Sequence, residues 1–469
     1  IDKVLILIYK KFLADLTNKS YKEHTKISAL KKKEQRKLAN TEDFDVECLI
    51  TLIKKLGNDQ FLTSTIKMCR TKFYNDVFNA VKDKNLNLMG CENGVIESCV
   101  ENSYFRVGKP EDYLTMSTMT RFNPNLTLKS PSVIKLMNWL SKVFCDHNDP
   151  KKGYVRGELL DFFLKDSASH LIGRNPEKRL RIWLGKTHAS KSLIEKLYQM
   201  TFGGYCVDLL SSFIIKTFNS GGGGPSPELA QLDGAHTGFY NELDDDDDLV
   251  AGKVKKRTGG DRFFARKNHE NGGSIESTTK DILVTNVMPY CPNFDDAVIE
   301  RYSVLLFPSK FVYDAPESIE DQFKTNRFKR NDFFEDELPD LAQAFLWILV
   351  TKYYSLYKKE GIIHPNILKD FMNEYWDEVD PYRNYVKEQL CVNYIDKNKT
   401  ILDNETHCTM IDVYISFSRW FKNNYPKNEV PKKSKIKKEL SSERNLGPQD
   451  NNKKWIGWNI KKINDNYFL

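Results

Sequence analysis

The sequence predicts an α/β fold organised around a strand, a polar loop and a helix in the middle of the chain. The apolar run Arg181–Leu184 has the composition of a strand, and apolar residues in 193–198 then recur at the spacing of one helix face. Two further runs, Asp281–Asn286 and Tyr302–Phe307, have the length and composition of buried strands. These segments favour a core of strands covered by helices.

Composition limits the classes of protein to which the chain can belong. Its 469 residues are 29% charged and 40% hydrophobic, enough for about three globular domains. The apolar runs Val4–Tyr9 and Leu341–Val350 are too short to span a membrane, and we expect the second to be a buried helix. Nine cysteines without a C-x-x-C pair argue against a disulfide framework or a zinc site and favour a reducing compartment.

The net charge bears on possible partners, and the first residue bears on the extent of the polypeptide. The net charge of +7 is compatible with a polyanionic partner but does not require one. The chain begins at Ile1 rather than methionine, so we expect a fragment of a longer polypeptide.

The loop after the first strand resembles the Walker A phosphate loop, G-x-x-x-x-G-K-[ST]. Backbone N–H groups of such a loop curl around phosphates, Lys191 would reach the β- and γ-phosphates, and the Ser192 hydroxyl would bind Mg²⁺. Ser190 replaces the second glycine, so a serine must take the tight turn without glycine's freedom at positive φ. An ordinary helix-capping loop is the alternative. The predicted nucleotide-binding residues here are Gly185, Lys186, Thr187, His188, Ala189, Ser190, Lys191 and Ser192.

A carboxylate ends the strand expected at Thr237–Glu242. Such a group positions the attacking water and holds Mg²⁺ through water, so we predict both roles for Glu242. Asn241 is predicted to lie beside the nucleotide, where aspartate is common, and its neutral side chain would bind the metal more weakly. The five aspartates Asp244–Asp248 favour a solvated loop over a metal site, because unbroken like charge repels itself.

The basic segment that follows is predicted to be a hairpin. Its string K-x-x-T-G-G-D-x-x-x-A-R begins at Lys255 and ends at Arg266. Lys267 and His269 lie near the expected tip, where they suit contacts with the phosphates of a single strand. A basic surface hairpin without such a partner is the alternative. The predicted DNA contacts are Lys255, Lys256, Arg266, Lys267, Asn268 and His269.

Two more polar residues flank the remaining strands. Asn286 ends a buried apolar strand, a position that suits a sensor of the γ-phosphate. Arg301 directly precedes the strand Tyr302–Phe307, where an arginine is usually a salt-bridged surface residue.

The order of these features resembles that of superfamily 3 helicases. The phosphate loop, the acidic strand, the T-G-G-D hairpin, the Asn286 strand and Arg301 follow one another with short connections. Upstream, Asn93–Val95, Phe105–Thr115 and Arg121–Pro124 resemble the small domain that precedes the helicase in primase-helicases of poxviruses and other large cytoplasmic DNA viruses.

The resemblance implies an AAA+-like P-loop ATPase that forms a ring, commonly a hexamer. ATP or another NTP would bind with Mg²⁺ between subunits, with Lys191, Glu242 and Asn286 from one subunit. Arg301 would act from the next subunit as an arginine finger. Hydrolysis would move the hairpins along single-stranded or forked DNA. The family also implies viral replication proteins as partners, no membrane, and a replication site in the host cytoplasm.

We divide the chain into five predicted regions. They are an α+β pre-helicase domain (1–125), a helical collar or linker (126–164), the superfamily 3 ATPase (165–315), a helical region (316–400) and a basic winged-helix-like module (401–469).

The last region combines an apolar helix face with clustered lysines. Val413, Phe417 and Trp420 are expected on one side of a helix, and Lys453–Ile460 is expected to form a closing hairpin. A basic helical tail that packs on the ATPase is the alternative.

A second function remains open at this stage. A nucleotide-binding, DNA-binding scaffold that hydrolyses weakly or not at all would also fit, because Ser190 and Asn241 both depart from the expected pattern. A non-helicase AAA+ loader is disfavoured by the T-G-G-D hairpin.

Overall fold

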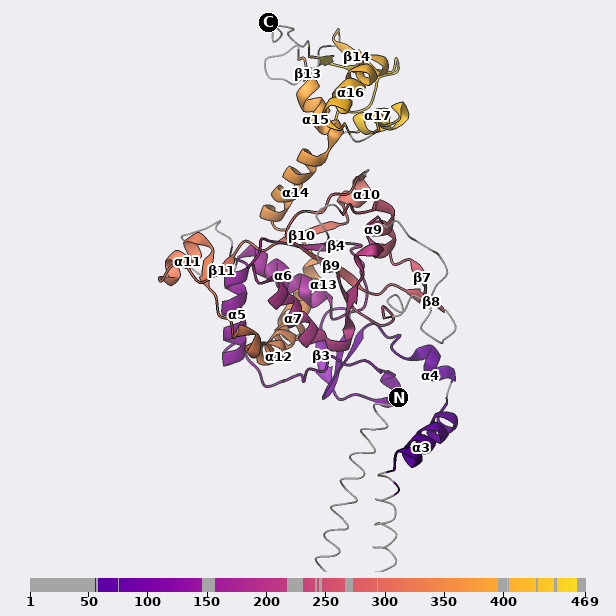
Figure 1. Cartoon of the computed structure of the whole chain (residues 1–469), viewed down its shortest axis with the longest axis vertical. Coiled ribbons are helices and arrows are strands. Elements are labelled where there is room, and N and C mark those ends of the chain that lie inside the picture. The colour runs from indigo at the N-terminus through magenta and orange to yellow at the C-terminus, as the bar shows by residue number, and fades with distance from the viewer. Residues whose placement is uncertain are drawn as a thin grey trace, which may run out of the picture. The chain divides into compact units, whose positions relative to one another are not determined.

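The computed structural model describes residues 55, 58–74, 76–145, 157–216, 231–240, 243, 247–265, 273–292, 294–394, 403, 405–426, 429–442 and 445–461. The chain forms two compact units, which meet in sequence between Lys82 and Asp83. The described part of the first unit contains helices α3 (Asp59–Lys72) and α4 (Asp76–Val81) (Figure 1). Asn58 caps α3, because its side-chain oxygen accepts from the second and third N–H groups of the helix.

The second unit begins with a three-stranded antiparallel sheet of β1 (Leu88–Cys91), β2 (Gly94–Ser98) and β3 (Ser103–Arg106). Cys91 pairs with Gly94, so a tight turn joins β1 to β2. Arg106 donates to both carboxylate oxygens of Asp112 at 2.9 and 2.7 Å and thereby fixes the segment after β3. The segments Asn93–Val95 and Phe105–Thr115, which carried the upstream resemblance, therefore contribute a turn and an ion pair to the fold.

A five-stranded parallel sheet forms the centre of this unit, with its strands in the order β10-β4-β9-β6-β5. Figure 1 labels β10, β4 and β9 of this sheet. Leu184 at the end of β4 lies opposite both Thr285 and Leu306, so the carboxyl ends of the three neighbouring strands share one edge. The bounds of the sheet's strands are β4 (Leu180–Leu184), β5 (Cys206–Leu209), β6 (Thr237–Tyr240), β9 (Lys280–Thr285) and β10 (Tyr302–Leu306). The predicted strands are confirmed as β4, β9 and β10, and as β6 over its described residues.

Alternate residues of these strands face two hydrophobic cores. On one face Trp183 packs against Phe163, Tyr198 and Phe239, with ring centroids 5.2–6.3 Å apart. The apolar stripe of residues 133–144 joins this core. The helices here are α5 (Pro131–Val143), α6 (Glu158–Ser169), α7 (Lys191–Phe202) and α12 (Leu338–Ile348).

The opposite face of the sheet has its own core. Ile182, Leu283 and Val304 bury their side chains there with Val254 and Trp376. The contributing helices are α9 (Ala251–Thr258), α10 (Asp296–Ile299) and α14 (Asn366–Val379).

Smaller elements complete the unit. The predicted buried helix at Leu341–Val350 is confirmed as α12, continued by the π-helical turn η5 (Leu349–Tyr353). None of the helices that the structure describes is long and apolar enough to cross a membrane. The other elements are η1 (Pro110–Asp112), η2 (Gly203–Tyr205), η3 (Ser211–Phe213), β7 (Arg262–Ala265), β8 (Gly273–Glu276), β11 (Lys310–Val312), α11 (Ile319–Thr325), β12 (Arg327–Lys329), η4 (Phe334–Glu337) and α13 (Tyr354–Glu360).

The last elements enclose a third core, into which the predicted face of α16 points. The predicted hairpin at Lys453–Ile460 is wrong in its pairing, because β15 pairs with β14 and β16 pairs with β13. Only Gly457 separates β15 from β16, which is too short a connection for two strands to fold back on each other. The bounds are α15 (Pro381–Gln389), β13 (Leu390–Val392), β14 (His407–Thr409), α16 (Met410–Asn424), α17 (Lys433–Leu440), β15 (Lys454–Ile456) and β16 (Trp458–Ile460).

Candidate functional site

The predicted phosphate loop connects β4 to α7 at the carboxyl edge of the sheet. Its first glycine is required by packing: a Cβ atom on Gly185 would lie 2.6 Å from the Cβ of Phe307. Lys186, Thr187 and His188 are exposed, whereas the Ala189 side chain is buried. The loop therefore has an anchored beginning and an exposed middle.

The end of the loop uses left-handed backbone at two non-glycine residues. His188 and Ser190 each have a φ of 66°. The sequence predicted that Ser190 must take a glycine-like turn, and this is confirmed, since its φ and ψ of 66° and 15° are left-handed. The Ser190 side chain makes no capping hydrogen bond to compensate. The tight turn thus forms with serine in place of glycine, at some conformational cost.

Lys191 and Asn286 meet at the carboxyl edge. Lys191 Nζ donates to Asn286 Oδ1 at 2.7 Å and also to the carbonyl oxygen of Gly185. Lys191 is buried and begins α7, whereas Asn286 directly follows β9 and is exposed. Two residues predicted to contact the same phosphate group are therefore brought together. Ser192 is exposed in the first turn of α7.

A cavity of about 800 Å³ opens beside this pair. Lys186 and Asn286 line it from the sheet edge, together with residues 306–310 at the end of β10. Phe371 and Tyr375 of α14 form part of another wall. The volume lies in the range of small-molecule and cofactor sites, and the lining combines aromatic and polar side chains.

The acidic strand and the metal site are only partly described. Tyr240 ends the described part of β6, and the predicted residues Asn241 and Glu242 lie outside the described residues. Within the parts of the chain that the structure describes, no group of three or more His, Cys, Asp or Glu residues could hold a metal ion. The roles of Ser192 and Glu242 toward Mg²⁺ stay predictions.

The predicted hairpin is present as the antiparallel pair β7–β8, in which Arg262 lies opposite Glu276. Lys255 and Lys256 precede it in α9, where Lys255 Nζ lies 2.6 Å from a carboxylate oxygen of Asp295. Lys256 Nζ lies 5.0 Å from the centre of the Phe263 ring. The other predicted DNA contacts, Arg266, Lys267, Asn268 and His269, lie outside the described residues.

Arg301 lies at the opposite edge of the sheet from the loop of its own chain. It precedes β10, and its carbonyl oxygen accepts from the first N–H group of β4, whose other end carries the loop. Its Nε donates to Thr258 Oγ1 at 3.1 Å, and its Nη1 donates to the Ala297 carbonyl at 2.5 Å. Arg301 therefore does not join Lys191 and Asn286 within one chain.

Comparisons with known proteins find similarity to viral proteins. Residues 10–145 match the family model "D5 N terminal like". The chain is 27% identical over 387 residues to "Putative helicase 121R" of Invertebrate iridescent virus 3, covering 80% of this chain and 39% of that protein. It is 26% identical over 389 residues to "Putative helicase L207/L206" of Acanthamoeba polyphaga mimivirus, covering 81% and 38% respectively.

The chain is thus similar to putative helicases of several large DNA viruses, and its residues 10–145 match a family model named for an N-terminal region. The resemblance drawn from the sequence is confirmed at that level. The chain spans about two-fifths of the length of the curated relatives that it matches. Among solved structures, the apo C-terminal region of NrS-1 is similar at 13% identity and a TM-score of 0.38, over 66% of this chain and 77% of that one.

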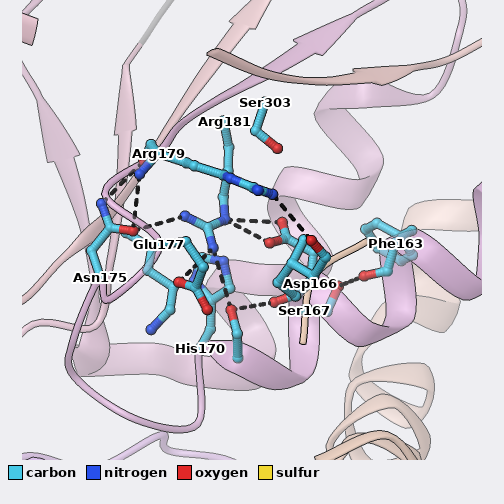
Figure 2. A network of polar contacts seen from close by, with 12 residues as sticks. Phe163, Asp166, Ser167, His170, Asn175, Glu177, Arg179, Arg181 and Ser303 are labelled. Atoms are coloured by element: carbon cyan, nitrogen blue, oxygen red, sulfur yellow. Dashed lines mark hydrogen bonds and ion pairs between the residues drawn. The ribbon is translucent and has the colours of Figure 1, made fainter. Parts of the chain in front are cut away.

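A buried charge network that the sequence analysis missed lies near the amino ends of the strands (Figure 2). Arg181 Nε donates to both carboxylate oxygens of Asp166 at 2.8 and 3.0 Å, and its Nη2 lies 3.8 Å from Glu177. Burial opposes the charge of Arg181, but the two carboxylates raise its pKa. An arginine inside an otherwise apolar strand was the available signal.

Lys280 and two histidines belong to the same buried region. Lys280 Nζ donates to the carbonyl of Ile172 at 2.8 Å, and burial, with Arg181 nearby, lowers the pKa of Lys280 to about 7. Burial also lowers the pKa of His236 to about 3 and that of His170 well below its usual value. These groups are enclosed by protein, so they serve the fold rather than the candidate site.

Proposed function

We propose that the chain is an ATP-dependent DNA helicase of superfamily 3, with an AAA+-like P-loop core. The observation that carries this proposal is the meeting of Lys191 and Asn286, 95 residues apart in sequence, beside a cavity of about 800 Å³. Open parallel sheets bind ligands beyond the carboxyl ends of their strands, where neighbouring strands connect in opposite directions. Here β9 and β10 flank β4 at that edge.

The residues then take definite roles. ATP or another NTP would place its phosphates against the loop 185–192, with Lys191 on the β- and γ-phosphates. Mg²⁺ would bind through Ser192 and, by way of water, Glu242, while Asn286 would sense the γ-phosphate. The present contact of Lys191 with Asn286 supports this, because two donors to one phosphate must lie within reach of each other.

DNA binding and assembly complete the proposal. The β7–β8 hairpin would contact single-stranded or forked DNA in the channel of a homo-oligomeric ring, for which we propose six subunits. Arg301 supports a ring, since it precedes β10 at the edge away from its own loop. It would stabilise charge on the phosphate of a neighbouring subunit. Viral replication proteins as partners, a site in the host cytoplasm and the five regions predicted above belong to the same proposal.

A second candidate is a nucleotide-binding scaffold of a viral replisome that hydrolyses weakly or not at all. The left-handed Ser190 favours it, because a strained loop could hold nucleotide in a less productive geometry.

Measured ATP hydrolysis with and without single-stranded DNA separates these functions. We expect turnover that single-stranded DNA increases, and Glu242→Gln should retain ATP binding while losing turnover. Unwinding of a forked duplex should require ATP. Wild-type protein that binds ATP but never hydrolyses it would favour the scaffold.

Mixing two inactive variants tests the ring. Lys191→Ala and Arg301→Ala should each be inactive alone, but rings that exchange subunits should regain activity at interfaces with both residues intact. Exchange is verified by fluorescence transfer between labelled subunits. An Arg301→Ala variant with full activity would remove the finger from the mechanism.

A further inference from the structure

Helix α9 contacts both the predicted finger and the sheet, immediately before the hairpin begins. Thr258, its last residue, accepts from Arg301 Nε at 3.1 Å and donates to the Val254 carbonyl at 2.8 Å. Thr258 is 1% exposed. Its hydroxyl is therefore both aligned by its own helix and directed at the guanidinium group.

The preceding residue ties the same helix end to β9. Arg257 Nη2 and Nε donate to the two carboxylate oxygens of Asp281 at 2.8 and 2.9 Å, and Tyr240 Oη donates to the same carboxylate at 2.8 Å. Arg257 and Asp281 are 3% and 1% exposed, so water does not screen the pair. Burial opposes the charge of Arg257, but Asp281 raises its pKa. β9 then leads to Asn286 at its other end.

Two further contacts extend this connection. The guanidinium carbon of Arg257 lies 5.3 Å from the ring centre of Phe263 on the hairpin strand β7. Lys255 forms an ion pair with Asp295, which caps the short helix before Arg301. Gly260, between α9 and β7, has a φ of 79°, a conformation that an L side chain rarely adopts. One helix end is thus joined to the hairpin, to the strand that carries Asn286 and to Arg301.

We propose that Thr258 is the positioning residue of Arg301, and that Arg257 and Thr258 together couple the DNA hairpin to the finger. A shift of β7 on DNA would act on Arg257 through Phe263, and through the adjacent Thr258 it would set the guanidinium of Arg301. This inference rests on the proposed function and adds a route by which DNA regulates turnover. Neither Arg257 nor Thr258 is among the residues that line the cavity at the carboxyl edge.

The first test removes the hydroxyl that holds Arg301. Thr258→Val in the full chain should lower the kcat of DNA-stimulated ATP hydrolysis about tenfold or more, with KM for ATP and the affinity for single-stranded DNA within about twofold of wild type. Thr258→Ser keeps the hydroxyl and should restore turnover. Thr351→Val is the matched control, since that hydroxyl also bonds a carbonyl of its own helix, at 2.8 Å.

A double-variant cycle separates positioning from a general structural role. Thr258→Val combined with Arg301→Ala should be no slower than Arg301→Ala alone, because both remove the same interaction. Losses that multiply, or a Thr258→Val variant as active as Thr351→Val, would overturn the inference. If the valine variant unfolds below the assay temperature, Thr258→Ala provides the same comparison with less bulk.

A second measurement tests the contact between Arg257 and the hairpin. Phe263→Leu should lower the ratio of DNA-stimulated to basal ATP turnover, with both rates measured on the same variant at saturating single-stranded DNA. Full stimulation in this variant would overturn the coupling route. A wild-type chain without ATP hydrolysis would instead overturn the proposed function, and an inactive Arg301→Ala with an unaffected Thr258→Val would overturn only the inference.

Discussion

Positively charged side chains at the two ends of strand β4 have different surroundings. Near the amino end, Arg181 is 2% exposed and donates to both oxygens of Asp166 within the fold (Figure 2). Beyond the carboxyl end, Lys191 donates to oxygens of Asn286 and Gly185, two residues that line a cavity of about 800 Å³. Arg181 thus lies inside the fold with a carboxylate, whereas Lys191 and Asn286 meet at the edge of the sheet where the predicted phosphate loop lies.

This difference separates a structural charge from one suited to a ligand. A buried ion pair gains little net stability, yet removing one partner leaves a charge without compensation and is strongly destabilising. Lys191 contacts Asn286 at the carboxyl edge, where the proposed function places an incoming phosphate that an ammonium group can bind. The comparison predicts that substitutions at the carboxyl edge of the sheet change ATP turnover, and that substitutions at the amino edge change the stability of the fold.

Among the substitutions at the two edges of the sheet, replacing Lys191 should have the largest effect on ATP turnover. Lys191→Ala should reduce ATP turnover on the order of 10³-fold, as expected when a charged contact to a transferring group is lost. The midpoint of thermal unfolding should change little. Steady-state hydrolysis and a melting curve measure the two effects.

The control for this prediction is Lys196→Ala on the same helix, whose amine is paired with Glu335 and 44% exposed. It should leave turnover near the wild-type value. Near-wild-type hydrolysis by Lys191→Ala itself would mean that the loop does not bind the phosphates.

Breaking the buried pair is the second prediction. Asp166→Asn leaves Arg181 buried without its main carboxylate, and the free energy of unfolding should fall by about 3 kcal/mol or more. Activity per folded molecule should remain, because the pair lies at the other edge of the sheet. Chemical denaturation measures the loss.

Asp332→Asn is the matched control, since Arg330 and Asp332 form an ion pair on the surface, 40% and 46% exposed. Its cost should stay below about 1 kcal/mol. Equal losses in both variants would contradict the distinction between a buried and an exposed pair.

The sequence predicted the carboxyl edge better than the amino edge. The loop, the strand that ends at Asn286 and the glycine-like turn at Ser190 are local patterns, and the structure contains them. The pairing of Asp166 with Arg181 joins a helix to a strand across a change of direction, which periodicity does not encode. The predicted pairing of β15 with β16 was wrong for a related reason, because tertiary packing decides which strands pair.

The pH dependence of stability tests the amino edge by changing the protonation of Lys280, without a substitution. Burial lowers the pKa of Lys280 from 10.5 to about 7, so above pH 7 the unfolded chain binds a proton that the folded chain does not. The free energy of unfolding should therefore rise between pH 7 and about 8.5, by at most about 1.4 kcal/mol per pH unit. Denaturation at several pH values measures this slope.

Lys280→Met should remove the rise, whereas Lys165→Met, at a lysine paired with Glu360 near the surface, should keep it. An unchanged slope in Lys280→Met would assign the effect to another group. The window ends near pH 8.5 because burial raises the pKa of Cys91 from 9.0 to about 12, and such groups reverse the slope at higher pH.

Ser190 lies in the loop at the carboxyl edge, and Ser190→Gly should have a smaller effect on turnover than Lys191→Ala and a smaller effect on stability than Asp166→Asn. A left-handed conformation costs an L residue roughly 1–2 kcal/mol relative to glycine, while glycine loses more entropy on folding. Since the Ser190 side chain makes no capping hydrogen bond, the first contribution should prevail. We expect about 0.5–1 kcal/mol of stabilisation, with ATP turnover equal to or above that of the wild type.

Ser190→Ala separates backbone strain from the loss of the hydroxyl. It keeps the Cβ atom at a φ of 66°, so it should not stabilise the fold. If glycine and alanine stabilise equally, strain at Ser190 is not the cause. If glycine stabilises the chain but lowers turnover, the serine itself contributes to the reaction, and the loop is adapted to the residue it contains. Stabilisation together with retained turnover would mean that the departure from the glycine pattern affects only stability, which would remove the main argument for a scaffold that does not hydrolyse ATP.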